Sequence, residues 1–166
     1  KEYITLDHNE FDFTRRRMSV VVKSPNGQRF LIVKGAFESI SSICTHVRLT
    51  SHDANKIHEG NTLYAESALC DETHFHDEHL NDAAMHQCME VVDHYRKEGC
   101  STIVIAIKAW NKNTSSKEDE TDMTLVGFFT LLDPPRDSAR ESLTKMKQLG
   151  VDIKVLSGDD PFVTES

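Results

Sequence analysis

The sequence lacks any apolar run close to the about 18 residues that a membrane-spanning helix needs. Its start, KEYITLDHNE, lacks the apolar centre of a signal peptide, so we expect none. It also lacks an excess of positive charge. The net charge is −8, which argues against nucleic acid as the main partner, because a phosphate backbone attracts a basic face. What remains is a globular composition, with 38% hydrophobic residues and enough length to bury a core.

No C-x-x-C pair occurs among the cysteines, which are Cys44, Cys70, Cys88 and Cys100. We expect reduced thiols in a cytosolic protein, with a disulfide pair as the less favoured alternative. The chain of 166 residues fits one domain, or one domain and part of another.

The first half of the chain predicts a hairpin followed by a helix. A strand is expected over 11–22, a turn at Ser24-Pro25-Asn26-Gly27 and a returning strand over 29–34. Apolar residues spaced by three and four predict a helix over 36–47. Residues 48–78 are polar without a clear period, so we expect a long loop or insertion there, with a short strand near 62–64 as an alternative.

The second half regains a pattern. A helix of about five turns is expected after His79, ending at Gly99, and two buried strands are expected over 102–110 and 123–132. Prolines then interrupt the chain. A further helix should follow and end at Gly150, and VDIKVL should form a short buried strand. The residues of that helix expected to face inward are Ala139, Leu143, Met146 and Leu149.

These elements predict two joined architectures. Residues 1–131, with a variable insertion at about 48–78, are expected to form an α+β domain in which helices flank an antiparallel sheet. Residues 132–166 are expected to form a hinge and part of a parallel, Rossmann-like α/β domain. In such domains ligands gather at the carboxyl ends of the strands.

Several short motifs occur in a fixed order. The pattern Phe-x-x-x-x-basic-x-Met-Ser-Val begins at Phe11 and includes Arg16 and Met18. Lys34-Gly35-Ala36 follows, and then come Asp133-Pro134-Pro135-Arg136 and Ser157-Gly158-Asp159. Each motif is weak alone, but the ordered set resembles the cytoplasmic nucleotide-binding domain of P-type ATPases, continuing into their phosphorylation domain. The variant FDFTRRRMSVVV is most similar to the magnesium-transporting branch.

The resemblance implies a nucleotide site made of Phe11, Arg16, Met18, Lys34, Gly35 and Ala36. Phe11 would stack on adenine, and such stacking contributes about 1–3 kcal/mol per base. Lys34 would lie at the base of the adenine pocket, where Gly35 would allow close approach of the ligand. Arg16 would face the phosphates, with which a guanidinium pairs well.

The resemblance also implies a role in a larger enzyme. Its cofactors would be ATP and the Mg²⁺ that accompanies the nucleotide, and its partners the phosphorylation, actuator and transmembrane domains of an ion pump. The γ-phosphoryl group would pass to an aspartate in Asp-Lys-Thr-Gly-Thr, which this sequence does not contain. We therefore expect a monomeric cytoplasmic fragment of a membrane protein that binds ATP without turning it over. Asp133 to Arg136 would be a hinge.

Two positions depart from the family pattern. Ser101 stands where the family often has an arginine that reaches the phosphates, so that contact is lost or supplied by another residue. Ser157 stands where the family has threonine, a mild change because both carry a hydroxyl group.

Simpler interpretations stay open for each feature. Without the family resemblance, Phe11 would be expected in the core. Phe13 is expected in the core with or without that resemblance. At most one or two of the three arginines can face a ligand, because side chains alternate along a strand. The stretch from Cys70 to His79, with His86 and Cys88 beyond it, has the ligand types of a zinc site. Its spacing matches no standard site, so an acidic, solvated insertion without metal is favoured.

Two other functions remain as alternatives. One is a non-catalytic interaction domain with a vestigial nucleotide site, for which Ser101 is the best support. The other is a piece of a haloacid-dehalogenase-type phosphatase, suggested by Ser157-Gly158-Asp159, although the expected antiparallel domain argues against it.

Overall fold

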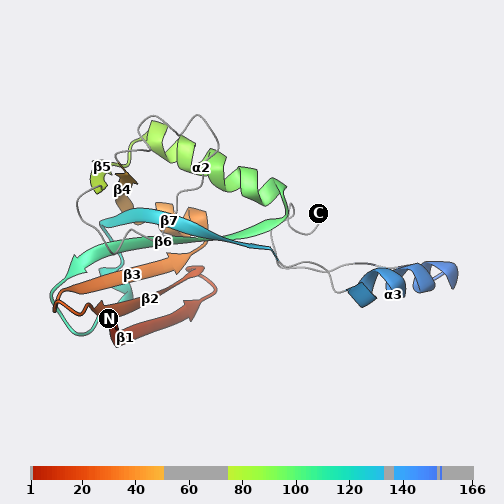
Figure 1. Ribbon diagram of the computed structural model, residues 1–166, viewed down its shortest axis with the longest axis horizontal. Coiled ribbons are helices and arrows are strands. Elements are labelled where there is room, and N and C mark those ends of the chain that lie inside the picture. The colour runs from red at the N-terminus through yellow and green to blue at the C-terminus, as the bar shows by residue number, and fades with distance from the viewer. Residues whose placement is uncertain (1, 51–74, 133–136, 153, 155–166) are drawn as a thin grey trace.

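The computed structural model describes residues 2–50, 75–132, 137–152 and 154 of the chain. Seven strands form one mixed sheet in the order β1-β2-β3-β6-β7-β4-β5 (Figure 1). All neighbouring strands run antiparallel except β4 and β7, which are parallel. The elements are β1 (Ile4–Asp12), β2 (Arg17–Lys23), β3 (Arg29–Gly35), α1 (Phe37–Ser41), β4 (Cys44–Thr50), β5 (Phe75–His79), α2 (Asp82–Lys97), β6 (Cys100–Trp110), the 3-10 turn η5 (Lys117–Asp119), β7 (Met123–Leu132) and α3 (Asp137–Gln148).

The single strand expected over 11–22 is wrong, because the chain reverses between β1 and β2. The Asp12 carboxylate accepts hydrogen bonds from the backbone N–H groups of Thr14 (2.9 Å) and Arg15 (3.3 Å). Arg16 completes the turn with a φ of 53° and donates its N–H to the Asp12 carbonyl at 2.6 Å. An aspartate that accepts from the next backbone amides stabilises a turn without glycine or proline. We call residues 13–16 the arginine turn.

The second hairpin is confirmed. Ser24 and Gly27 close its turn through a backbone hydrogen bond of 2.9 Å, and Gly27 has a φ of 91°, which favours glycine. The strands β2 and β3 then pair without a break from Lys23 opposite Arg29 to Arg17 opposite Gly35.

The helix expected over 36–47 is wrong in its second half. The helix α1 ends at Ser41, and β4 begins at Cys44 and pairs in parallel with β7. Ile43 and Val47 fit a spacing of four, but β-branched residues at 43, 45 and 47 also suit a strand. Pairing with β7 decides between the two. Within the expected loop at 48–78, β4 extends to Thr50 and β5 covers 75–79, whereas the strand considered near 62–64 lies outside the described residues.

The elements α2, β6 and β7 are confirmed, as is the end of α2 near Gly99, whose φ is 78°. The helix α2 begins at Asp82, and the preceding Asn81 caps it by accepting the N–H of Ala84 at 2.9 Å. Of these two boundary residues, Gly99 was identified from the sequence, whereas the capping role of Asn81 was not.

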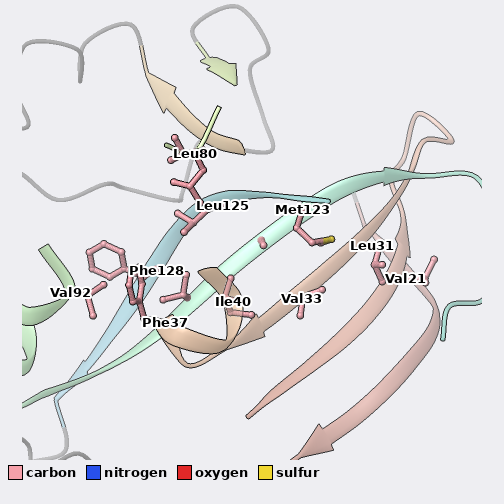
Figure 2. Close-up of a cluster of buried hydrophobic side chains, with 13 residues drawn as sticks. Val21, Leu31, Val33, Phe37, Ile40, Leu80, Val92, Met123, Leu125 and Phe128 are labelled. Carbon is pink, nitrogen blue, oxygen red and sulfur yellow. The ribbon is translucent and has the colours of Figure 1, made fainter. Parts of the chain in front are cut away.

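The main core lies between the sheet and the helices α1 and α2. Leu31, Val33 and Ala106 are fully buried on the strands, and Ile40 of α1 is buried against them. Figure 2 labels Leu31, Val33 and Ile40 together with Phe37, Val92 and Phe128, which extend the cluster toward α2. Among the described elements, α1 and α2 pack against one face of the sheet, so residues on the opposite face are more exposed (Figure 1).

The helix α3 forms as expected, but of the residues expected to face inward Ala139 is only half-buried and the others are exposed. Leu143 is 43% exposed, Met146 44% and Leu149 79%, and Figure 1 shows α3 apart from the sheet. Val151, Asp152 and Lys154 do not form the expected strand. The motif residues 133–136 and 157–159 lie outside the described residues, so the Rossmann-like part of the chain stays a prediction. No helix in the described ranges is both long and apolar enough to cross a membrane.

Candidate functional site

A row of residues crosses the exposed face of the sheet at the end where the arginine turn lies. Met18 of β2 pairs with Lys34 of β3, and Lys34 pairs with Ile105 of β6. Lys34 is exposed whereas the adjacent Val33 is fully buried, so Lys34 points away from the core. A bulge in β1 brings Glu10 and Phe11 opposite Met18 alone. Phe11, Met18 and Lys34 therefore lie together at one end of the sheet.

Two phenylalanines are open to water at this end. Phe11 is 48% exposed and Phe13 is 87% exposed, so the expectation that Phe13 belongs to the core is wrong. Their rings meet edge to face, with centroids 5.1 Å apart and an interplanar angle of 88°. The position of Phe13 in a turn rather than a strand explains its exposure. An exposed aromatic side chain offers an apolar ring face to a ligand.

The three consecutive arginines have different environments. Arg15 and Arg17 both donate to one carboxylate oxygen of Glu120, Arg15 through Nη1 and Arg17 through Nε at 2.7 Å. Glu120 is 1% exposed. Burial alone would lower the pKa of Arg15, but the hydrogen bonds and charges of Glu120 and, to a smaller extent, Asp12 together outweigh it and raise that pKa. Arg16 is exposed, and its side chain makes no hydrogen bond to any described residue.

Asp12 joins the arginine turn to the segment before β7. Its carboxylate accepts from Lys117 Nζ at 2.9 Å and from Arg15 Nε at 3.2 Å. The hydrogen bond from Lys117, followed by those from Arg15, holds the pKa of Asp12 well below its usual value. Farther along β1, Asn9 donates to the Ser115 carbonyl and Asp7 accepts the Ser115 N–H. We call residues 111–122 the β6–β7 loop; it holds β1 and the arginine turn at several points.

Gly35 lies against the arginine turn. A Cβ at this position would come within 2.4 Å of the Arg16 carbonyl oxygen and 2.7 Å of the Arg17 Cβ. Ala36 donates its N–H to the same Arg16 oxygen at 3.1 Å. The close approach seen here is between two parts of the chain, whereas approach of a ligand at Gly35 stays a prediction. Lys34-Gly35-Ala36 thus fixes the position of the turn that carries Arg16.

A carboxylate lies near Arg16 on the first turn of α1. Burial would raise the pKa of Glu38, but hydrogen bonds to its own backbone and from Arg96, together with the charges of Arg96 and Arg16, hold this pKa below its usual value. Arg96 donates to Glu38 at 3.0 Å. Glu38 therefore belongs to the electrostatic surroundings of Arg16.

Sequence reasoning missed Glu120, Asp12 and Ser39 as parts of this arrangement. Ser39 accepts from Arg17 Nη1 at 3.2 Å and donates its hydroxyl to the Arg15 carbonyl. Glu120 stands in a polar segment, NKNTSSKEDETD, in which nothing marks one acidic residue as buried. Asp12 alone carried a local signal, because an aspartate followed by polar residues is typical of a turn.

Other features of the described residues give no second site. Ser101 is half-buried on β6 opposite Leu131 of β7. Within residues 2–50, 75–132, 137–152 and 154, no group of three or more His, Cys, Asp or Glu side chains could hold a metal ion. His46 and His79 pair across β4 and β5 with ring centroids 5.9 Å apart, but His74 and Cys70 lie outside the described residues. Cys44, Cys88 and Cys100 are free thiols.

Comparison with known proteins agrees with the motif order. Residues 1–70 match the model of the P-type ATPase cytoplasmic domain N. The chain is 34% identical to a Salmonella typhimurium protein named magnesium-transporting ATPase, P-type 1, over 98% of this chain and 16% of that protein. It is 29% identical to the Escherichia coli K12 protein of the same name, over 95% of this chain and 15% of that protein.

A more distant relative transports another ion according to its name. The chain is 25% identical to an Arabidopsis thaliana protein named calcium-transporting ATPase 4, endoplasmic reticulum-type, over 95% of this chain and 14% of that protein. The chain therefore spans only 14–16% of the length of these relatives.

Proposed function

Because the chain belongs to the P-type ATPase family, with its first 70 residues matching the cytoplasmic domain N, we propose that the exposed end of its sheet binds ATP. The observation that carries this proposal is that the exposed Phe11 and Phe13 lie at the end of the sheet that also carries the exposed Lys34 and the arginine turn. The site combines exposed aromatic rings with exposed cationic side chains, which suits the base and the phosphates of a nucleotide.

The adenine ring would lie on Phe11, with Met18 and Lys34 beside it. Stacking of a base on an aromatic ring contributes about 1–3 kcal/mol. Met18 is an adaptable apolar neighbour for a ring. Lys34 pairs with Met18 on the neighbouring strand and is exposed, so its ammonium group can reach a bound base.

The phosphates would lie toward Arg16. Its guanidinium is the one member of the three-arginine run that is exposed and free of hydrogen bonds to the described residues. Gly35 and Ala36 would hold this arginine in place through the turn rather than touch the phosphates. Mg²⁺ would arrive with the nucleotide and neutralise part of its charge.

The larger reaction is proposed for the protein of which this chain is a part. There, the γ-phosphoryl group would pass to an aspartate outside residues 1–166, and the aspartyl-phosphate would drive cation transport. Magnesium is the cation we propose, since the relatives of highest identity here are named for its transport. We propose that residues 132–166 form the hinge, at Asp133, Pro134, Pro135 and Arg136, and part of the phosphorylation domain, which contains Ser157-Gly158-Asp159. Residues 1–131 would then form a cytoplasmic domain of a membrane pump.

The test is a titration of the 166-residue chain with ATP followed by amide chemical shifts. We expect a dissociation constant near 1 mM, about −4 kcal/mol, because the site is open and has one exposed arginine. The shifts should concentrate at the arginine turn, β2 and the end of β3. No shift at several millimolar ATP would favour the alternative of an interaction domain with a vestigial site, for which Ser101 in place of an arginine is the supporting feature.

A further inference from the structure

We propose that Glu120 is a positioning residue for the nucleotide site: by binding Arg15 and Arg17, it determines that Arg16 alone faces the nucleotide. This inference rests on the proposed function. It assigns a role to the β6–β7 loop, which the adenine and phosphate contacts do not use.

The geometry separates the three arginines into two sets. Glu120 receives Arg15 and Arg17 on the same oxygen, Oε2, and it is almost fully buried beneath them. The side chains of Arg15 and Arg17 are only 16% and 15% exposed, so both guanidinium groups are withdrawn from solvent. The residue between them has a φ of 53° and points its side chain to the surface.

The charges explain why one carboxylate has this effect. The cluster beneath the turn contains three cations, Arg15, Arg17 and Lys117, and two anions, Asp12 and Glu120. Loss of the Glu120 charge would leave the cations with Asp12 alone. Because an unpaired charge in a buried position is unfavourable, the guanidinium groups would move toward solvent or toward a bound phosphate. Glu120 thus suppresses two competing phosphate contacts.

Contacts other than those of Glu120 hold the backbone of the arginine turn, whereas Glu120 determines where the arginine side chains lie. Gly35 leaves room for the Arg16 backbone, Ala36 binds the Arg16 carbonyl, and Ser39 binds both Arg15 and Arg17. The backbone of the turn should therefore survive a change of charge at residue 120. The expected response is redistribution of the arginine side chains, not loss of the hairpin.

The experiment compares Glu120→Gln with the matched variant Glu118→Gln in the 166-residue chain. Glu118 lies in the same loop and is exposed, and it makes no ion pair with the arginine turn. Each protein is titrated with adenosine and with ATP at one low salt concentration. The ratio of the two dissociation constants measures the contribution of charge to phosphate binding, and it does not change when only the folded fraction falls.

We expect Glu120→Gln to raise the preference for ATP over adenosine about fivefold, since two more cations become available at an exposed site. Glu118→Gln should leave the preference unchanged. In the parent chain, Arg16→Ala should abolish the preference for ATP over adenosine. In the Glu120→Gln variant, the same substitution should leave part of that preference. A preference that stays at the parent value in Glu120→Gln, or additive effects of the two substitutions, would overturn the proposal.

Two further measurements keep the proposal testable if Glu120→Gln folds poorly or if nucleotide does not bind. Arg17→Met removes a partner of Glu120 instead of its charge, and it should retain the parent preference for ATP; a loss as large as that of Arg16→Ala would overturn the proposal. Limited trypsin digestion needs no nucleotide. We expect cleavage after Arg15 and Arg17 to be faster in Glu120→Gln than in Glu118→Gln, and equal rates would contradict the assigned role even if ATP binding itself had failed.

Discussion

The backbone of Arg16 lies so close to Gly35 that a single added methyl group at residue 35 would overlap the Arg16 carbonyl oxygen. The φ of Gly35 is not in the left-handed region, so backbone conformation does not require a glycine there. The close contact with Arg16 does. The atom in the way belongs to the backbone and cannot turn aside as a side chain could.

We therefore expect Gly35→Ala to displace the arginine turn and to weaken ATP binding at least tenfold. The matched control is Gly27→Ala, in the other hairpin turn, where a Cβ meets no atom within 4 Å but the φ of 91° disfavours alanine. Both variants should lower the melting temperature, and only Gly35→Ala should change the affinity for ATP. Equal ATP affinities in the two variants would show that the contact has no bearing on the site.

Phe11→Ala should weaken ATP, ADP and AMP alike, by about 1–3 kcal/mol, because all three share the ring that would stack on Phe11. The melting temperature should change little, since the side chain is 48% exposed. Lys34→Ala should behave in the same way. Leu31→Ala is the comparison for a core residue: Leu31 is fully buried, and its truncation should cost about 2–5 kcal/mol of unfolding free energy. Calorimetry beside each titration separates the two effects.

Arg16→Ala should weaken ATP most and AMP least, because its guanidinium would face the phosphates. The difference between parent and variant should shrink as salt is added, as it does for exposed charges. Lys23→Ala, at the other end of β2, is the control for a general loss of positive charge. Titrations with the three nucleotides at two salt concentrations are sufficient, and an equal loss for AMP and ATP would place Arg16 away from the phosphates.

Asp12 should make the stability of the turn depend on pH. Its pKa is held below the ordinary value of 3.8 by Lys117 and Arg15, so its contribution is complete above about pH 4 and is lost as the pH falls toward the lowered pKa. Urea unfolding of the parent and of Asp12→Asn should therefore differ at pH 7 and converge below pH 4. Glu10→Gln, in the same strand, serves as the control. A gap between parent and Asp12→Asn that stays constant from pH 7 to pH 3 would contradict this assignment.

Local signals in the sequence were sufficient for much of the sheet. The hairpin at Ser24 to Gly27, the helix α2 and the strands β6 and β7 each carry their own period, cap or turn residues. The strand β4 carries no such local signal. Only its parallel pairing with β7 favours a strand there over a continuation of the helix α1. Cys44 lies opposite Met123 in that pairing, and no local pattern contains this information.

That the proposed site residues bind a nucleotide stays a prediction, and their surroundings could not be derived from the sequence. Ordered motifs identified Phe11, Arg16 and Lys34, and the structure places all three at one end of the sheet. The exposure of Phe13 depends on a turn that contains no glycine or proline. The distinction between Arg16 and its neighbours depends on Glu120, which lies 105 residues from Arg15. Ion pairs at such separations leave no trace in a single sequence.

The same separation has a consequence for the nascent chain. Residues 1–70, the part that matches the family domain, leave the ribosome well before residue 120 is made, at about 5–20 residues per second. During that interval Arg15 and Arg17 have no Glu120, and β3 has no β6 to pair with. In a truncated product that ends before Glu120, all three arginines would be available to a phosphate, and β3 would be an unpaired edge strand. Selective recognition of a nucleotide would begin only after the segment leading into β7 has been synthesised and has folded back.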